Sequence, residues 1–323
     1  MKYLVGVVLV MGGCTALPSQ GSSPVRARPV APVSVVAGSG EPRWVEVTQP
    51  GLAATEDTPA SSDAITFELK PHRKNYIVMS YDTGLPGRAP STLGGDNRPA
   101  EIKFQISIRE SFFDSEDGRG RFAIAYTAKS FWQIFDKSAP FRTTDHEPEL
   151  FYEWEPGDTF TQLRFGLHHH SNGEGGAASR SWNRVFAQSR WVDPDNFMWQ
   201  RGSAFVLKPR EEREGVAWET ALRAWGKFAV DEDNNDDISE YYGYFELTGD
   251  LYWNGPSEPH LGVLLRNNGR RSGENRGALE LNYSYTVYEG LRMLVHYFNG
   301  YGESLIDYRD SANRIGVGIE LSR

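Results

Sequence analysis

The chain has 323 residues, a net charge of -9 and a hydrophobic fraction of only 39%, with 33 glycines, 15 tyrosines and 9 tryptophans. This length suits two ordinary domains or one large β-barrel, so it does not fix the number of domains. The acidic balance and the lack of a basic patch argue against nucleic acid as a partner, because phosphate binding depends on clustered basic side chains. Beyond the N-terminus no apolar run approaches the roughly 20 residues of a membrane helix, which excludes a helical membrane protein.

The N-terminus has the pattern of an export signal. Lys2 is followed by an apolar run from Leu4 to Met11, two glycines and Cys14, and we predict a signal peptide over residues 1–20. The single cysteine rules out an internal disulfide. Its position resembles a lipoprotein processing site, although Met11 occupies the place where leucine is usual. Cys14 is therefore either lipidated or discarded after cleavage nearby by an ordinary signal peptidase. Either reading gives a protein of the cell envelope.

The composition changes after this signal. Residues 21–66 are rich in Pro, Ser and Ala and lack periodicity, a composition that cannot bury a core, so we predict a disordered extension there. From about Asn75 onward, short segments of alternating apolar and polar residues are separated by Gly, Pro, Asn and Asp, the pattern of β-strands. We predict a single all-β domain over residues 67–323.

Three segments show the alternation most clearly, with polar or small residues at the positions between the apolar ones. About a dozen comparable segments occur, an even number as bacterial membrane barrels require, and no helical pattern competes with them. The apolar faces of the three segments consist of Ile102, Phe104, Ile106 and Ile108, of Leu279, Leu281, Tyr283 and Tyr285, and of Ile315, Val317, Ile319 and Leu321.

A soluble sandwich or a lipocalin-like barrel would alternate in the same way. Aromatic residues near strand ends, such as Phe131-Trp132 and Tyr252-Trp253, favour the membrane barrel because their rings can form interfacial girdles. In the alternative reading these rings fill a soluble core. The C-terminal Leu321-Ser322-Arg323 departs from the aromatic residue with which outer-membrane barrels commonly end.

The segment from Thr161 to Ser171 carries the chemistry. Its face of Leu163, Phe165 and Leu167 continues into His169 and Ser171, whereas Gln162, Arg164, His168 and His170 lie on the other face. In a membrane barrel the apolar face meets lipid, so His169 and Ser171 would lie on the outer wall, where polar groups are costly unless they have partners.

A partner is available on the following strand. If the chain forms a hairpin through the glycine-rich stretch 173–178, Asn183 lies near His169 on the lipid side. Serine is a weak nucleophile that needs an imidazole to accept its proton, and the imidazole needs a third group to fix its tautomer. Ser171, His169 and Asn183 can fill these three roles, although a His-x-Ser pair also occurs by chance.

Two other segments contain side chains that bind metals in some proteins. His168 and His170 face away from His169 on a strand, so one transition metal cannot bind all three, and the outer two more plausibly lie in the lumen or at its rim. The acidic run from Asp231 to Asp237 lacks the glycine and the terminal Glu of an EF-hand loop and is better read as a solvated loop. The stretch from Met198 to Gly215 is read by default as a loop or an edge extension.

Two runs of sequence, His169-His170-Ser171-Asn172-Gly173 and Ser179-Arg180-Ser181-Trp182-Asn183-Arg184, resemble the signature of the bacterial outer-membrane phospholipase A family. The resemblance extends from about Asn75 to the C-terminus. It includes the segments Lys129-Ser130-Phe131-Trp132-Gln133, Ser138-Ala139-Pro140-Phe141-Arg142, Glu147-Pro148 and Tyr301-Gly302-Glu303-Ser304-Leu305-Ile306-Asp307-Tyr308.

The resemblance implies a twelve-stranded antiparallel outer-membrane barrel with A1, A2 and lysophospholipase activity on phospholipid acyl esters, active as a calcium-bound homodimer. It implies Ser171 as nucleophile, His169 as base and Asn183 as orienting residue, with the Gly173 N–H at the oxyanion. The Ca²⁺ ligands that it implies, all oxygens, are the Ser179 hydroxyl, the Glu174 carbonyl, the Ser138 carbonyl of the partner chain, and water.

Two positions depart from the family pattern. Glu174 occupies the place of an expected arginine, which matters little for a carbonyl ligand. Ala128 occupies the place of a glutamine at the dimer interface, which puts the strength of dimerisation in question. The rival hypothesis is a non-enzymatic porin-like or structural barrel that keeps the motif without turnover.

Overall fold

The computed structural model describes residues 69–84, 98–157, 160–200, 204–230, 234–271 and 273–321. The predicted signal peptide and the extension over 21–66, including Cys14, lie outside these residues. A thirteen-stranded sheet, less the two-residue β1 (Lys70–Pro71), leaves twelve barrel strands. These strands are β2 (Asn75–Asp82), β3 (Ala100–Phe112), β4 (Gly120–Trp132), β5 (Phe141–Trp154), β6 (Thr161–Ser171), β7 (Ser181–Val192), β10 (Val216–Val230), β11 (Phe245–Trp253), β12 (His260–Asn267), β13 (Gly277–Tyr288), β14 (Leu291–Tyr301) and β15 (Ser311–Leu321).

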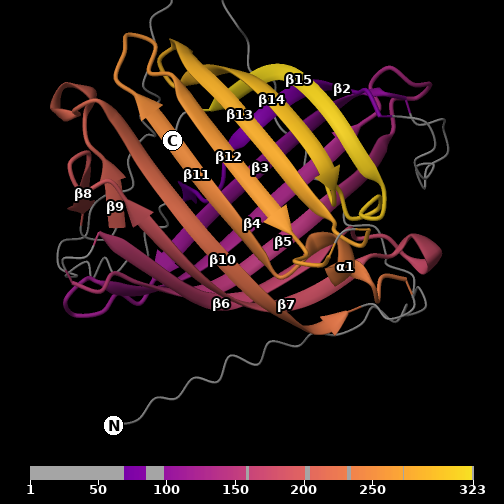
Figure 1. The fold of residues 1–323 in the computed structure, drawn as a ribbon, viewed down its shortest axis with the longest axis horizontal. Coiled ribbons are helices and arrows are strands. Elements are labelled where there is room, and N and C mark those ends of the chain that lie inside the picture. The colour runs from indigo at the N-terminus through magenta and orange to yellow at the C-terminus, as the bar shows by residue number, and fades with distance from the viewer. Residues whose placement is uncertain are drawn as a thin grey trace, which may run out of the picture. The chain divides into compact units, whose positions relative to one another are not determined.

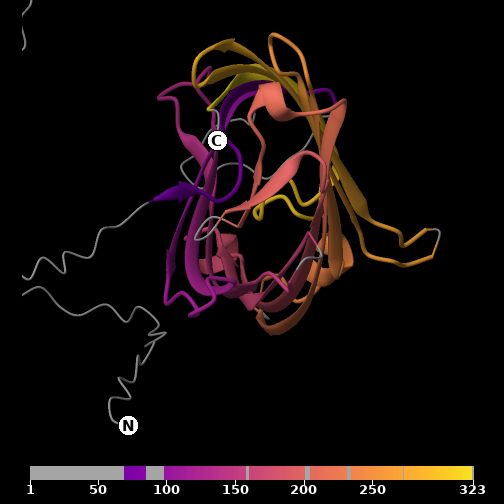
Figure 2. The same ribbon diagram turned by 90° about the vertical axis from the view of Figure 1, so that its left-hand side faces the viewer.

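The twelve strands close into a barrel. Each strand is antiparallel to the next along the chain, and β15 returns to pair with β2. Figures 1 and 2 show the tilted strands and the closed wall. Closure removes sheet edges, so every barrel strand has two neighbours to which its backbone can hydrogen-bond, as hydrocarbon surroundings demand. The predicted all-β barrel and its strand number are confirmed.

The barrel places its polar side chains inside and its apolar side chains outside. Lys103, Glu153 and His296 are fully buried in the interior, whereas Ile106 and Val317 are 56% and 51% exposed on the outer wall. In water, exposing an aliphatic side chain of this size forgoes about 1.5–3 kcal/mol of burial. The large apolar exterior therefore excludes the soluble sandwich and the soluble barrel, and it matches a wall that faces lipid.

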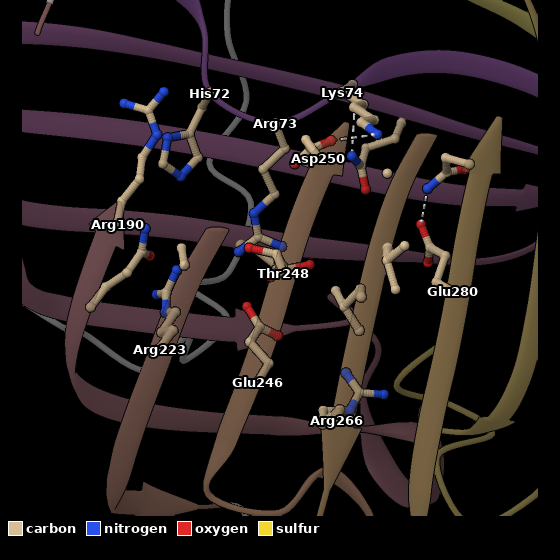
Figure 3. A pocket seen from close by; sticks show the side chains of 18 of the residues that line it. His72, Arg73, Lys74, Arg190, Arg223, Glu246, Thr248, Asp250, Arg266 and Glu280 are labelled. Carbon is tan, nitrogen blue, oxygen red and sulfur yellow. Dashed lines mark hydrogen bonds and ion pairs between the residues drawn. The ribbon is translucent and has the colours of Figure 1, made fainter. Parts of the chain in front are cut away.

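Charged side chains fill much of the lumen around a cavity of about 550 Å³. Between β1 and β2 the chain takes five residue steps from Pro71 to Tyr76, against three on β3 from Ile108 to Gln105. The chain leading into β2 therefore carries two more residues than β3 over this stretch, and we call the segment of His72, Arg73 and Lys74 the lumenal bulge. Figure 3 shows their side chains in the cavity wall, where Lys74 pairs with Asp250 of β11 at 3.2 Å.

Short elements occupy the two ends of the barrel. The five-residue helix α1 (Ile238–Tyr242) lies between β10 and β11. The sequence pattern, which indicated strands alone, did not predict it. In the described part of the chain no helix is long and apolar enough to span a membrane. The remaining short elements are the 3-10 turns η1 (Gly176–Ala178) and η2 (Arg210–Glu212) and the strands β8 (Phe197–Gln200) and β9 (Ala204–Leu207).

The stretch from Met198 to Gly215 is not an edge extension of the barrel. Its hairpin β8–β9 forms a separate two-stranded sheet, which lies across the barrel mouth in Figure 2. Phe197 and Phe205 are buried there with Val192 and Ala217, and Phe205 also lines the lumenal cavity. Closed barrels have no free edge to extend, so the inserted strands pair with each other and pack inward.

Candidate active site

The face of β6 that carries His169 and Ser171 lies on the outer wall, as predicted. His168 and His170 are buried inside, Phe165 is 51% exposed, and His169 and Ser171 are half-buried on the same outer face. One metal cannot bind all three adjacent histidines, because the middle ring lies on the opposite side of the sheet from its neighbours. In the described chain, no three His, Cys, Asp or Glu side chains converge at a metal site.

β7 brings Asn183 to His169. The two residues are cross-strand partners, and His169 Nδ1–H donates to Asn183 Oδ1 at 2.9 Å. With its proton fixed on Nδ1, the ring presents an unprotonated Nε2 as acceptor. This is the form that a general base requires.

Ser171 lies two positions beyond His169 on the same face, about 6.6 Å along the strand. Within the described residues no hydrogen bond joins its Oγ to His169. Such contacts commonly tighten only when substrate binds. The geometry leaves Ser171 Oγ free to approach either His169 or an ester that arrives from the lipid side.

The loop after β6 offers a free backbone donor. Gly173 has φ +68°, a conformation that a side chain would strain, and its N–H meets no acceptor among the residues described. Asn172 holds the loop in shape, since its Nδ2 donates to the Ala178 carbonyl at 2.8 Å and its Oδ1 accepts from the Arg180 N–H at 3.0 Å. These bonds hold the loop without using the Gly173 N–H.

The interior behind the site is packed and charged. Glu147 of β5 accepts from His168 Nε2 at 3.1 Å, and the fully buried Trp182 donates to His170 Nδ1 at 3.4 Å. The Arg184 guanidinium lies 4.0 Å from the Trp182 ring centre. These contacts fix the inner faces of β5, β6 and β7, so the outer faces keep their register.

Loops from distant parts of the chain brace the same end of the barrel. Asn235 is fully buried and exchanges two hydrogen bonds with the Ser181 backbone, at 3.1 and 3.0 Å. The loop between β14 and β15 inserts buried Leu305, whose N–H donates to the Asp145 carboxylate at 3.0 Å. The described part of the acidic run, residues 234–237, is thus more than a solvated loop. Sequence periodicity carries no signal for such contacts.

The proposed calcium ligands lie in two turns at this end. Ser179 follows η1, Glu174 precedes it, and Ser138 lies in the turn between β4 and β5 with φ +65°. Among the described residues, the Ser179 hydroxyl and the Glu174 carbonyl have no hydrogen-bond partner. Oxygen donors left free in this way suit Ca²⁺, which accepts hydroxyl and carbonyl oxygens in flexible geometry.

The lumenal cavity is distinct from this site. His168 and His170 line it, whereas Ser171, His169 and Asn183 do not. The outer face that carries these three residues is therefore separate from the lumenal cavity.

A family model described as Phospholipase A1 matches residues 53–321. The chain belongs to the phospholipase A1 family. Phospholipase A1 of Salmonella typhimurium is 30% identical over 268 residues, covering 79% of this chain and 82% of the relative. A putative phospholipase A1 of Neisseria meningitidis is 32% identical over 271 residues, covering 78% and 64%.

Solved structures agree with this membership. Outer membrane phospholipase A from Escherichia coli superposes with a TM-score of 0.62 at 27% identity, covering 79% of this chain and 99% of that one. A calcium-bound dimer of the Salmonella typhi outer membrane phospholipase gives 0.62 at 25% identity, covering 81% and 94%. The resemblance drawn from the two sequence runs is confirmed, and this phospholipase A1 family hydrolase is an outer-membrane β-barrel.

Proposed function

We propose that this phospholipase hydrolyses acyl esters of phospholipids and lysophospholipids on its lipid-facing wall, with Ser171 as nucleophile, in a calcium-dependent homodimer. The observation that carries the proposal is the hydrogen bond between His169 and Asn183 beside an outward-facing serine. A neutral amide orienting a base on a lipid-exposed strand has no evident structural purpose, because polar groups there are costly.

The reaction follows from the positions of the side chains. Ser171 Oγ attacks the ester carbonyl carbon while its proton passes to His169 Nε2, and Asn183 Oδ1 holds Nδ1–H in place. The carbonyl oxygen becomes an oxyanion that accepts from the Gly173 N–H. Collapse breaks the bond to the glycerol oxygen, which takes the proton from His169. Water then attacks the acyl-serine, giving its proton to His169, and the fatty acid leaves with Ser171 restored.

Calcium fits beside this site. Ser179 through its hydroxyl, Glu174 through its carbonyl and the carbonyl of a second copy's Ser138 would hold the ion, which supplies positive charge for the oxyanion when bound. The relative from Salmonella typhi was solved as a dimer with bound calcium. Because one ligand comes from the second copy, we propose that dimerisation controls activity by completing the calcium site.

The test is fatty-acid release from phospholipid micelles by the refolded protein, with calcium and with a strong chelator, alongside Ser171→Ala. We expect calcium-dependent release that the substitution lowers by at least about 10⁴-fold. Release that survives chelation would remove calcium from the mechanism. Equal background in every sample, together with ion conduction by the native protein, would favour a non-enzymatic barrel.

A further inference from the structure

A second outward-facing imidazole lies beside the nucleophile. His146 of β5 is half-buried on the outer wall and is the cross-strand partner of Ser171. In an antiparallel pair, the Cα atoms of such partners are about 4.5–5.5 Å apart. The same row across the sheet continues from Ala128 through His146 and Ser171 to Ser181. His146 therefore lies on the side of Ser171 opposite β7, which carries Asn183.

Tyr126 orients this imidazole. Its hydroxyl lies 2.6 Å from His146 Nδ1, and the two rings are stacked with centroids 6.2 Å apart. A phenol is a far better proton donor than a neutral imidazole N–H, so the short contact is an O–H···N bond in which Tyr126 donates. Nδ1 is then the acceptor nitrogen, and the proton of the neutral ring must be on Nε2.

The protonated nitrogen lies close to the oxyanion donor. His146 Nε2 is 3.5 Å from the position that a Cβ atom on Gly173 would take, and that position is about 2.5 Å from the Gly173 amide nitrogen by standard bond geometry. The two nitrogens are thus separated by about 6 Å or less. One oxygen can accept from both at ordinary hydrogen-bond lengths of about 2.7–3.2 Å. Among the residues described, His146 Nε2 has no other partner.

We propose that His146 is a further catalytic residue, which donates its Nε2–H to the oxyanion that forms on the ester carbonyl. The inference rests on the proposed function, because it requires Ser171 to attack that carbonyl. His146 Nε2–H and the Gly173 N–H both donate hydrogen bonds to this oxygen. His146 keeps its proton, and none of its covalent bonds forms or breaks. Tyr126 is a positioning residue that fixes the tautomer.

The main alternative for His146 is a second general base. Proton transfer from Ser171 would require an unprotonated Nε2, which the hydrogen bond from Tyr126 to Nδ1 disfavours. His169, held by Asn183, already presents the unprotonated nitrogen. The two imidazoles beside Ser171 are thus locked in opposite tautomers by their partners, one to accept a proton and one to donate a hydrogen bond.

The test compares His146→Phe and His146→Gln in the full-length refolded protein on phospholipid micelles with calcium. Phenylalanine fills the ring volume on a lipid-facing wall but has no donor, whereas glutamine places an amide N–H near the original Nε2. We expect His146→Phe to lower kcat by roughly 10²-fold, the low end for losing one oxyanion donor, with KM unchanged. His146→Gln should keep kcat within about tenfold of native, because a side-chain amide can replace an oxyanion donor.

Three results would overturn the proposal. These are a His146→Phe protein within about threefold of native, an equal loss in both variants, or a change confined to KM. If His146→Phe does not refold, as judged by its migration on an unheated gel, His146→Gln and Tyr126→Phe are compared with native protein. Native protein no faster than Ser171→Ala would instead overturn the proposed function, and this inference with it.

A second comparison tests the role of Tyr126. Tyr126→Phe should lower kcat less than His146→Phe, and the double variant should be no slower than His146→Phe alone, since both changes act on one hydrogen bond. Tyr283→Phe, an outward-facing tyrosine on β13, is the matched control and should leave kcat unchanged. Additive losses in the double variant would show that Tyr126 acts independently of His146.

Discussion

At the scale of single residues, Asn183 is the side chain that directly orients the proposed base, His169. Replacing it with alanine removes the acceptor for His169 Nδ1–H, so the ring can turn and adopt the wrong tautomer. We expect Asn183→Ala to lower kcat by about 10²-fold, within the range for general-base catalysis. Asn183→Asp keeps an acceptor and should remain much more active. Ser189→Ala, on the same face of β7, is the control. If steady-state kinetics gave the same kcat for both alanine variants, Asn183 would not orient His169.

Asp237 predicts a pH dependence in the loops that brace the site. Partial burial alone would raise the pKa of its carboxyl, but hydrogen bonds from Arg309 and Tyr308 outweigh that effect and hold the pKa below its usual value. A carboxyl with a lowered pKa stabilises the fold above about pH 4, its unfolded value, and this stabilisation disappears as the pH falls through the folded pKa.

Native protein should therefore lose stability relative to Asp237→Asn as the pH falls from about 5 to 3, by no more than about 1 kcal/mol for a partly exposed pair. Thermal unfolding of both proteins across this window measures the difference. A constant gap between their melting temperatures at all these pH values would contradict the assignment.

At the scale of elements, the lumenal bulge joins the start of the barrel to the strand behind the site. Arg73 bonds Glu147 at 3.1 Å and Glu149 at 2.8 Å, and Glu147 also pairs with His168 of β6. A regular strand between Pro71 and Tyr76 would place fewer side chains in the lumen. The bulge thereby supplies positive charge where β5 places two carboxylates.

Arg73→Met should lower the free energy of unfolding by about 1–3 kcal/mol, because it leaves buried carboxylates with fewer partners. We expect kcat to stay within about threefold of native, since His168 and Arg223 still pair with Glu147 and Glu149. Urea unfolding in micelles measures the first effect and fatty-acid release the second. Arg271→Met, at an exposed loop position, is the control. If Arg73→Met and Arg271→Met lowered the free energy of unfolding equally, the ion pairs of Arg73 would not stabilise the barrel.

At the scale of the whole molecule, the outer wall must serve both lipid and a second copy. Ala128 lies on that wall in the row that includes His146 and Ser171. A methyl group there offers no hydrogen bond to a facing copy, whereas amide side chains that meet within a membrane contribute about 1–2 kcal/mol. The proposed dimer of this chain therefore lacks one source of affinity.

Ala128→Gln should strengthen dimerisation in calcium-containing micelles by about tenfold, as measured by chemical cross-linking against protein concentration. Ala224→Gln, on the outer face of β10, should not change it. Chelation should return both to monomers. Equal strengthening by the two glutamines would locate the dimer contact elsewhere on the barrel.

The sequence by itself determined the barrel, its inward and outward faces, and the pairing of His169 with Asn183. Successive side chains of a strand face lipid and the polar lumen in turn, so apolar and polar residues alternate with a period of two that is visible within each strand. A short hairpin brings β6 and β7 together. Only the tertiary structure decided which residues of β4 and β5 lie beside Ser171. It also decided the lumenal bulge and the hydrogen bonds between Asn235 and Ser181. None of these features produces a local sequence pattern, because the register between strands depends on turns and on packing across the whole barrel.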